Sequence, residues 1–260
     1  PVAVASIAQV HRARLEDGTD VAIKVRLPGV KKLFEQDAKV FQVLAAIAAS
    51  RFREFDLKQA VEQLLIMTAM ELDFRNEAAN TRRFARQPHH PRIRIPDLIE
   101  GLCSERILVT TWEQGPRLRN HLDAHPEEAK DLLSVLLTSY LQQVTRFGVY
   151  QADPHPGNFL VSEDNELIAI DFGCIKEVPD AFYVPYFELA DPKNISDDKI
   201  FTEKLYQLEI LMPTDTQQEI TFFKSIFHQL LSLFTSPFHK KDFDFGDDDN
   251  KEEEKKAEAR

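Results

Sequence analysis

The sequence predicts an α+β protein in which a strand-rich part comes first and a helix-rich part follows. Near the start, residues 7–15 and 20–27 are β-prone runs on either side of Glu16-Asp17-Gly18, and Asp-Gly between such runs is a typical hairpin signal. In the second half, apolar residues recur mostly at helical spacing. With 260 residues, 43% of them hydrophobic, the chain is long enough to bury a sizeable core.

Helices and a second β region should follow the first hairpin. The chain leaves the hairpin at Pro28-Gly29, and residues 31–49 then carry apolar side chains near helical spacing. Residues 57–86 are predicted to form one long helix or two abutting ones, and residues 91–115 return to β character. The apolar positions of the first predicted helix are Leu33, Val40, Val43, Leu44 and Ile47.

A further helix should begin at Pro126, with acidic residues in its first turn, and end at Gly148. A short strand, a loop and a hairpin follow over 151–173, and helices from there to about residue 235. The last of them, 217–238, should pack mostly on the helical lobe, with contact to a membrane or a partner as the other interpretation. Its apolar positions are Ile220, Phe223, Phe227, Leu230 and Phe234, widened by Phe222, Ile226 and Leu233.

Composition excludes several classes of protein. The net charge of −11 argues against nonspecific nucleic-acid binding by the whole chain. Residues 239–260 are acidic and poor in apolar side chains, which predicts a disordered tail. Cys103 and Cys174 form neither a disulfide framework nor a metal-binding spacing, which indicates a reduced, cytoplasmic protein. The sequence has neither a run of 18 apolar residues nor a signal peptide, and its first residue, Pro1, suggests a fragment of a longer protein.

One stretch, "QADPHPGNFLVSEDNELIAIDFG" (151–173), carries the pattern of a phosphoryl-transfer site. Asp153 and Asn158 have the spacing D-x-x-x-x-N, and Asp171 follows in Asp-Phe-Gly after a predicted hairpin. Asp171 and Asn158 offer the oxygen ligands that Mg²⁺ prefers, and Asp153 could accept the proton of an acceptor hydroxyl. Upstream, "VAIK" places Lys24 on a predicted strand, as in kinases.

Each of these signals has an ordinary structural explanation when taken singly. Asp-Phe-Gly is a common turn, and "FDFG" recurs at 243–246 in the acidic tail, where we interpret it as chance. Asp153 and Asn158 could cap turns, and a single lysine on a strand, such as Lys24, is usually solvated. The order of the motifs on the predicted elements favours the phosphoryl-transfer interpretation.

The glycine-rich loop of kinases is absent before Lys24, and "PVAVASIAQVH" stands in its place. Together with "VAIKVRLPGV", "ELDFRNEAAN", "PRIRIPDLIEGLCSERILVTTWEQG" and "QADPHPGNFLV…IAIDFG", this stretch closely resembles the UbiB/AarF family of atypical, protein-kinase-like kinases, which is associated with ubiquinone biosynthesis. The resemblance covers residues 1 to about 180, is loose to 235 and is absent in the tail.

The resemblance implies roles for residues around Lys24. Lys24 matches the lysine that binds the phosphates of ATP, and Glu71 in "MELDF" matches the glutamate that would pair with it. Asp73 completes the family's E-x-D motif. Glu77 and Asn80 share the helix face of Asp73, and we expect Lys24 to pair with Glu71 rather than with Glu77. The alternative for this acidic helix is a solvated face with Glu/Arg pairs.

The nucleotide contacts that the resemblance implies come from two further segments. The alanine-rich loop would bring backbone N–H groups near phosphate, although alanine adopts positive φ less readily than glycine. The run "TTWEQG" (110–115) should meet the adenine with its backbone. The expected contact residues are Ala5, Ser6, Ile7 and Ala8 in the loop, and Thr111, Trp112 and Glu113 in the run.

The sequence also departs from the family pattern. Gln151 stands where many members have histidine, and the family's K-x-G-Q motif does not occur. Because the chain begins inside the alanine-rich loop, we expect the strand before that loop to be missing and the edge of the 7–15 strand to be unpaired. The cleft around Lys24, Asp153 and Asp171 should then be more open than in longer relatives.

The combined prediction is a two-lobed, protein-kinase-like fold. It comprises a small β-rich N-lobe with added helices (1–114), a larger helical C-lobe (115–238) and the acidic tail. Mg-ATP should bind between the lobes, with Asn158 and Asp171 on the metal. The expected activity is ATP hydrolysis or phosphoryl transfer to a small or lipid-related acceptor, in support of isoprenoid quinone (ubiquinone) synthesis.

Two other functions are compatible with the same residues. One is a catalytically weak ATP-binding scaffold that regulates a biosynthetic complex. The other is an antibiotic- or choline-type phosphotransferase, against which "ASIAQVH" and "ELDF" argue. Besides ATP, the expected partners are quinone-biosynthesis proteins or a lipid surface, without nucleic acid. The expected location is cytoplasmic, with the periphery of the inner membrane as a second interpretation.

Overall fold

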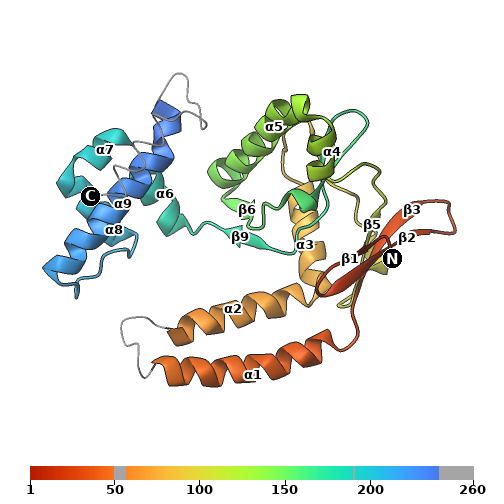
Figure 1. The fold of residues 1–260 in the computed structure, drawn as a ribbon, viewed down its shortest axis with the longest axis horizontal. Coiled ribbons are helices and arrows are strands. Elements are labelled where there is room, and N and C mark those ends of the chain that lie inside the picture. Colours follow the sequence, from red (N-terminus) through yellow and green to blue (C-terminus); the bar gives the residue numbers. More distant parts are fainter. Residues whose placement is uncertain (50–56, 190, 240–260) are drawn as a thin grey trace. The chain divides into compact units, whose positions relative to one another are not determined.

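The computed structural model describes residues 1–49, 57–189 and 191–239 (Figure 1). The chain divides into two compact units, Pro1–Glu177 and Val178–Arg260. Of the tail that the sequence predicts to be disordered (239–260), only His239 lies within the described residues.

The first unit begins with a four-stranded antiparallel sheet in the order β1-β2-β3-β5 (Figure 1). The predicted hairpin is present, and at its turn Gly18 adopts φ 90°, which favours glycine. The expectation of a missing first strand and an unpaired edge is wrong, because Ala3 and Val4 pair with Val10 and Gln9. The four strands are β1 (Ala3–Val4), β2 (Ala8–Arg14), β3 (Asp20–Arg26) and β5 (Ile107–Thr111).

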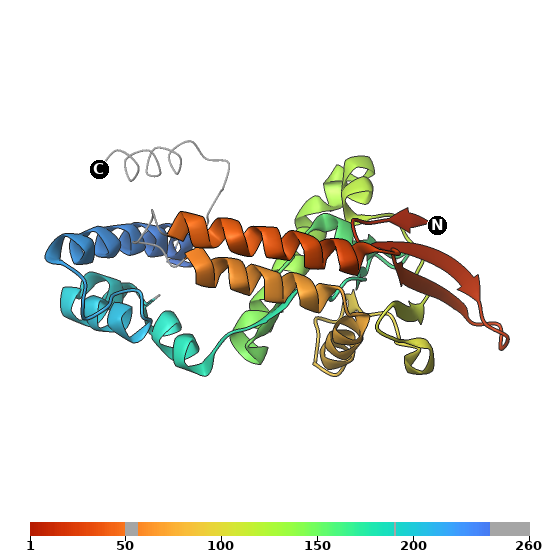
Figure 2. The same cartoon turned by 90° about the horizontal axis from the view of Figure 1, so that it is seen from below.

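Three helices separate β3 from the rest of the unit: α1 (Val30–Ala49), α2 (Leu57–Glu71) and α3 (Phe74–Ala85). Of the two possibilities for 57–86, the structure has two abutting helices. Asp73 ends the continuity because its carboxylate accepts a hydrogen bond from the backbone N–H of Arg75 and so caps α3. Helices α1 and α2 run side by side (Figures 1 and 2). Four of the apolar positions that predict α1 are more than half exposed, namely Leu33, Val40, Val43 and Leu44.

The remainder of the first unit is built from short strands and helices around a second core. Strands β4, β8 and β7 form a three-stranded sheet, and β6 pairs with β9. The elements are β4 (Ile93–Arg94), the 3₁₀ turn η1 (Glu100–Leu102), α4 (Leu118–Ala124), the 3₁₀ turn η2 (Pro126–Glu128), α5 (Ala129–Gln142), the π-helical turn η3 (Gln143–Phe147), β6 (Val149–Gln151), the 3₁₀ turn η4 (Pro156–Asn158), β7 (Phe159–Val161), β8 (Leu167–Ala169) and β9 (Ile175–Glu177). The short strand and the following hairpin therefore lie where the sequence predicts them.

Two glycines are needed for this chain path. A Cβ at Gly115 would lie 2.1 Å from the carbonyl oxygen of Val161, so the segment after β5 can approach β7 only without a side chain there. Gly148 has φ 60° and ends the π-helical turn in the left-handed conformation, as the sequence predicts for the end of this helix.

The second unit contains α6 (Asp180–Leu189), α7 (Pro192–Ser196), α8 (Asp198–Gln207) and α9 (Gln217–His239). Helix α9 matches the predicted phenylalanine-rich helix, and Leu231 on it is 4% exposed in the core of the unit, whereas Phe222 is exposed. The side chains of Leu233 and Phe234 lie outside the described residues. Among the helices in the described ranges, none has the length and apolar character that crossing a membrane requires.

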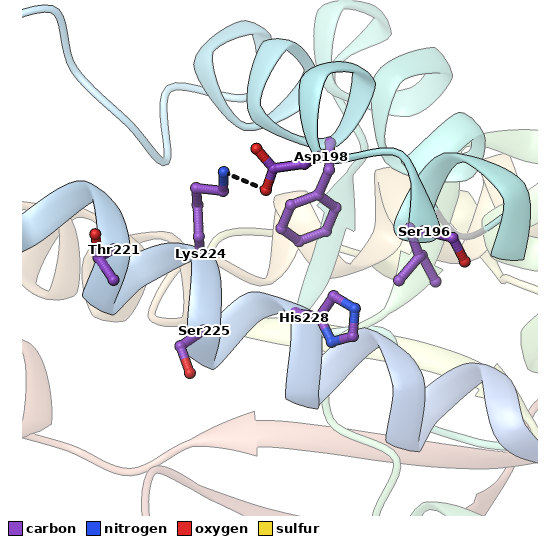
Figure 3. Close-up of a pocket in the computed structure, with 8 residues that line it drawn as sticks. Ser196, Asp198, Thr221, Lys224, Ser225 and His228 are labelled. Atoms are coloured by element: carbon purple, nitrogen blue, oxygen red, sulfur yellow. Dashed lines mark hydrogen bonds and ion pairs between the residues drawn. The ribbon is translucent and has the colours of Figure 1, made fainter. Parts of the chain in front are cut away.

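A shallow cavity of about 300 Å³ lies between α7, α8 and α9 within the second unit (Figure 3). At one side Lys224 donates a hydrogen bond of 2.6 Å to Asp198, and the two side chains form an ion pair (Figure 3). The imidazole of His228 packs edge-on against the ring of Phe201, with ring centroids 5.7 Å apart. These contacts hold α8 and α9 together.

The two neighbouring leucines of α9 should differ sharply in their contribution to stability. Leu231→Ala should lower the free energy of unfolding by about 2–5 kcal/mol, because it leaves a cavity in a closed core. Leu230→Ala, at a position that is 41% exposed, should lower it by less than about 1 kcal/mol. Urea denaturation followed by circular dichroism would measure both. Equal losses would contradict the placement of this helix face.

Candidate functional site

Lys24 lies in the middle of β3 and points toward α3. Its Nζ lies 2.8 Å from both carboxylate oxygens of Glu77 and 3.1 Å from Oδ2 of Asp171. The expected pairing of Lys24 with Glu71 is therefore wrong. The reason is that α2 ends at Glu71, and α3, which begins at Phe74, is the helix that packs on the sheet.

Burial governs the electrostatics of this pair. Desolvation acts to lower the pKa of Lys24, but the carboxylates of Glu77 and Asp171 outweigh it and raise the pKa overall. Burial raises the pKa of Glu77, and the Lys24 ammonium acts in the opposite direction. Glu77 is thus stabilised as a carboxylate chiefly by Lys24, and Lys24 is held in its charged form by two carboxylates.

Asp153 and Asn158 lie in the loop between β6 and β7. The Asn158 amide donates hydrogen bonds to Oδ2 and to the backbone carbonyl of Asp153, at 3.0 and 3.1 Å. The loop is closed by the 3₁₀ turn η4, whose first residue is Pro156. Asp153 is exposed, so a molecule from solvent can reach its carboxylate.

Asp171 follows β8 and is fixed from three directions. Its Oδ1 accepts a hydrogen bond of 2.9 Å from the backbone N–H of Gly173, and its Oδ2 contacts Lys24. The next side chain, Phe172, is buried against Phe84 of α3, with ring centroids 5.2 Å apart. Asn80 donates a hydrogen bond of 2.9 Å to the Phe172 carbonyl. Helix α3 therefore holds both Lys24 and the Asp-Phe-Gly segment.

A buried polar chain supports Asp171 from the side of α5. The side-chain amide of Gln151 donates 2.8 Å to the backbone carbonyl of Asp171, and the backbone N–H of Gln151 donates 2.9 Å to Oε1 of Gln143. Gln143 and Gln151 are 5% and 4% exposed. Gln143 is also the first residue of the π-helical turn, and such turns are frequent at functional sites.

Glu71, the last residue of α2, lies near the same group of carboxylates. Burial, followed by the charges of Asp171 and Asp153, raises the pKa of Glu71, while Lys24 acts to lower it. Glu71 is thus not the direct partner of Lys24, and its carboxylate adds to the negative charge of Asp171 and Asp153. This concentration of negative charge favours a bound cation.

A cavity of about 450 Å³ lies beside Lys24 within the first unit, a size that suits a small-molecule ligand. Its apolar wall is made by Val10, Ala22, Leu108, Leu160 and Ile170. The run 110–115 lines the cavity over its whole length, including Thr111, Trp112 and Glu113. Arg12 from β2 stacks on Trp112, with its guanidinium carbon 5.0 Å from the ring centroid.

The alanine-rich loop is a tight turn between β1 and β2. The Ala5 N–H donates a hydrogen bond of 2.8 Å to the Ala8 carbonyl, so this amide is already used within the turn. Ala8 is fully buried, and Ile7 packs on the same core as Phe74 of α3. Ser6 is exposed at the tip. Nucleotide contact by the four residues 5–8 stays a prediction.

The sequence motifs assign Gln143 no role in the site. They also do not predict that Glu77 pairs with Lys24 or that Asn80 contacts the Asp-Phe-Gly segment. Glu77 and Asn80 carried a usable signal, because together with Asp73 they fall on one helical face. Gln143 carried none that we can identify, since an amide in a helix is common and only the fold brings it to Gln151.

Residues 1–200 match the family described as ABC1 atypical kinase-like domain. The chain belongs to this family. It is 31% identical over 219 residues to Protein ACTIVITY OF BC1 COMPLEX KINASE 7, chloroplastic, of Arabidopsis thaliana. That alignment covers 82% of this chain and 32% of the relative. It is 29% identical over 219 residues to AarF domain-containing protein kinase 1 of Xenopus laevis, covering 79% of this chain and 42% of that protein.

The fold of this ABC1 domain also has a counterpart among solved structures. The complex of Rv3197 with erythromycin from Mycobacterium tuberculosis superposes with a TM-score of 0.76 at 25% identity, covering 97% of this chain and 63% of the other. The chain thus spans well under half of its curated relatives and about two thirds of that structure. It is an atypical kinase-like protein with a mixed strand and helix fold.

Removing one or the other glutamate near Lys24 should affect stability very differently. Glu77→Gln should lower the free energy of unfolding by roughly 2–3 kcal/mol, because it leaves the buried Lys24 ammonium with Asp171 alone. Glu71→Gln should not lower it, because it removes a charge that Asp153 and Asp171 repel. Thermal and urea denaturation at neutral pH in EDTA would compare them. A larger loss of stability for Glu71→Gln than for Glu77→Gln would instead support pairing of Lys24 with Glu71.

The buried amide chain should be needed to hold the Asp-Phe-Gly segment. Gln143→Leu leaves the Gln151 N–H buried without its acceptor, at a cost of about 1–3 kcal/mol. Hydrogen exchange of residues 149–153 and 170–174 should become faster. Gln142→Leu, one position earlier and only partly buried, is the matched control. Unchanged exchange in Gln143→Leu would mean that the chain of amides has no positioning role.

Proposed function

We propose that this chain binds Mg-ATP in the cavity beside Lys24 and either hydrolyses it or transfers its terminal phosphoryl group to a small or lipid-related acceptor. The observation that supports this most directly is the position of the Lys24 ammonium, which lines the cavity and is paired with Glu77. A lysine held in this way can donate to phosphate oxygens while the carboxylates keep it charged.

The donor set suits a magnesium ion. Asp171 offers a carboxylate, and Asn158 offers an amide oxygen that no donor contacts in the described part of the chain, since its Nδ2 makes both bonds to Asp153. Hard cations of this kind take oxygen ligands from one or two carboxylates, together with water and phosphate. When bound, the ion would neutralise charge on the phosphates. Asn158 and Asp171 would hold it, with Glu71 contributing further negative charge nearby.

The remaining residues of the site have separate tasks in this proposal. Asp153, exposed and oriented by the Asn158 amide, would accept the proton of the acceptor hydroxyl or of water. The apolar wall of the cavity and the backbone of 110–115 would hold the base. Gln151 and Asn80 position the Asp-Phe-Gly segment through the backbone carbonyls of Asp171 and Phe172.

The biological role that we propose is support of isoprenoid quinone synthesis, as the resemblance to the UbiB/AarF family implies. Membership of the ABC1 family and the kinase names of its relatives support the kinase-like part of the proposal. Partners would be quinone-biosynthesis proteins or a lipid surface, encountered at the cytoplasmic face of a membrane.

A scaffold that binds nucleotide without turnover is the second candidate. It is favoured by the direct contact between Lys24 and Asp171, because that contact occupies one of the carboxylate oxygens that a metal ion requires. If the contact persisted with nucleotide bound, the site would recognise ATP without aligning it for reaction.

Two substitutions separate binding from turnover. Asp171→Asn should weaken Mg-dependent ATP binding by at least about tenfold, because it removes a charged metal ligand. Asp153→Asn should leave binding nearly unchanged and lower phosphate release by about a hundredfold or more, because it removes the proton acceptor. Calorimetry and a phosphate-release assay would measure the two, with and without liposomes that contain a quinone-precursor mimic.

Each outcome of this experiment decides between the candidates. Wild-type binding of Mg-ATP without phosphate release under any of these conditions supports the scaffold. Failure of the folded wild type to bind Mg-nucleotide contradicts both candidates. Equal loss of binding in both variants would show that the roles of Asp153 and Asp171 are assigned wrongly.

A further inference from the structure

Two histidines and two glutamates cluster where α4 ends and α5 begins. His125 caps α4, and the 3₁₀ turn Pro126–Glu128 then leads into α5. One potential ligand atom from each of His125, Glu127 and Glu128 lies within 4.8 Å of the other two. The side chains of His125 and Glu127 are 50% and 70% exposed, so an ion could reach them from solvent.

His121 joins this cluster from the preceding turn of α4. Its Nε2 lies 2.9 Å from Oε2 of Glu128, and its ring centroid lies 4.9 Å from that of His125. Because a carboxylate has two oxygens, Glu128 can keep this contact with one oxygen and bind an ion with the other. Contacts of this type behind a ligand are the usual means of orienting it in protein metal sites.

The backbone favours binding because it is already in place. The three ligand residues fall within four consecutive positions, and Pro126 restricts the backbone of the turn between them. Binding would therefore order side chains without refolding the segment, which keeps the entropy cost low.

The donor set indicates the class of ion. Mg²⁺ and Ca²⁺ take oxygen ligands, so an imidazole nitrogen disfavours them. Zn²⁺ binds histidine nitrogen and carboxylate oxygen, commonly with three protein ligands and a water molecule. One imidazole and two carboxylates match that arrangement, and divalent ions late in the first transition row bind such sites more tightly than manganese does.

A neighbouring cavity of about 390 Å³ connects the cluster to the chain segment after β5. His121 and Glu128 line it together with Gln114 and Gly115, which also line the cavity beside Lys24.

We propose that His125, Glu127 and Glu128 form a binding site for a divalent transition-metal ion of the zinc type, with His121 orienting Glu128. The ion ties the end of α4 to the start of α5. The site shares no residue with the group around Lys24, and its existence does not depend on the proposed nucleotide function.

Calorimetric titration of the tag-free 260-residue chain with zinc chloride tests the site. The wild type should bind zinc at this site, and millimolar Mg²⁺ should not displace it. His125→Ala and Glu127→Gln should each weaken zinc binding at least about tenfold, because each removes one ligand. Zinc should also raise the melting temperature of the wild type and should raise that of Glu127→Gln much less.

Three control variants and one cobalt measurement test other groups that could bind zinc. His228→Ala in the second unit and Glu35→Gln on α1 should leave zinc binding unchanged. Asp171→Asn should still bind zinc at His125, Glu127 and Glu128, even if it no longer binds a metal ion at Asn158 and position 171. Binding of cobalt in place of zinc should show no thiolate-to-metal absorption, because neither cysteine takes part. Folding of each variant is checked by circular dichroism.

Two results would overturn the proposal. One is that His125→Ala and Glu127→Gln both bind zinc as tightly as the wild type does. The other is loss of all zinc binding in Asp171→Asn or after alkylation of the cysteines, since the ion would then sit on those groups.

Discussion

The ion pair between Lys24 and Glu77, with Asp171 as the second acceptor, is the contact on which the first unit depends. It joins three segments that are far apart in the sequence, namely β3, α3 and the turn after β8. A buried ammonium is costly unless it is paired, so these segments must come together for the unit to be stable. The fully buried ring of Phe74 has its centroid 5.4 Å from Nζ of Lys24, and Phe172 is buried in the core cluster that contains Phe84 of α3. Packing and charge thus select the same arrangement.

The short strands of the first unit serve to hold two loops. The β6–β9 pair and the β7–β8 pair bring the loop of Asp153 and the turn of Asp171 next to one another, with further backbone bonds from Ala152 to Cys174 and from Ile170 to Asn158. Short strands suffice because Asn158 directly precedes β7, and Asp153 and Asp171 each lie two residues after the end of a strand. The buried amides of Gln143 and Gln151 complete this frame without adding charge.

Apolar periodicity had different outcomes in different helices. In α9 it marks residues that pack against the core of the second unit, namely Ile220, Phe223 and Phe227, although Leu230 on the same predicted face is 41% exposed. In α1 it marks residues such as Leu33 and Leu44 that are more than half exposed in the structure. A periodic pattern predicts that a helix forms and that it has an apolar face, but burial depends on which surface that face meets.

By itself, the sequence determined the elements and the chemistry of this protein. Asp17-Gly18 set the first hairpin, Gly148 ended the long helix, and the order of Lys24, Asp153, Asn158 and Asp171 predicted a kinase-like site, because turns, caps and motif spacing act over a few residues. Tertiary structure decided which acid meets Lys24. Glu71 and Glu77 are six residues apart and equally acidic, but the chain turns at Asp73, so only the second lies on the helix that packs against the sheet. The same holds for Gln143, which meets Gln151 only because two separate elements fold onto each other. Such partners are selected by packing and desolvation between distant segments, and these act only after the elements have assembled.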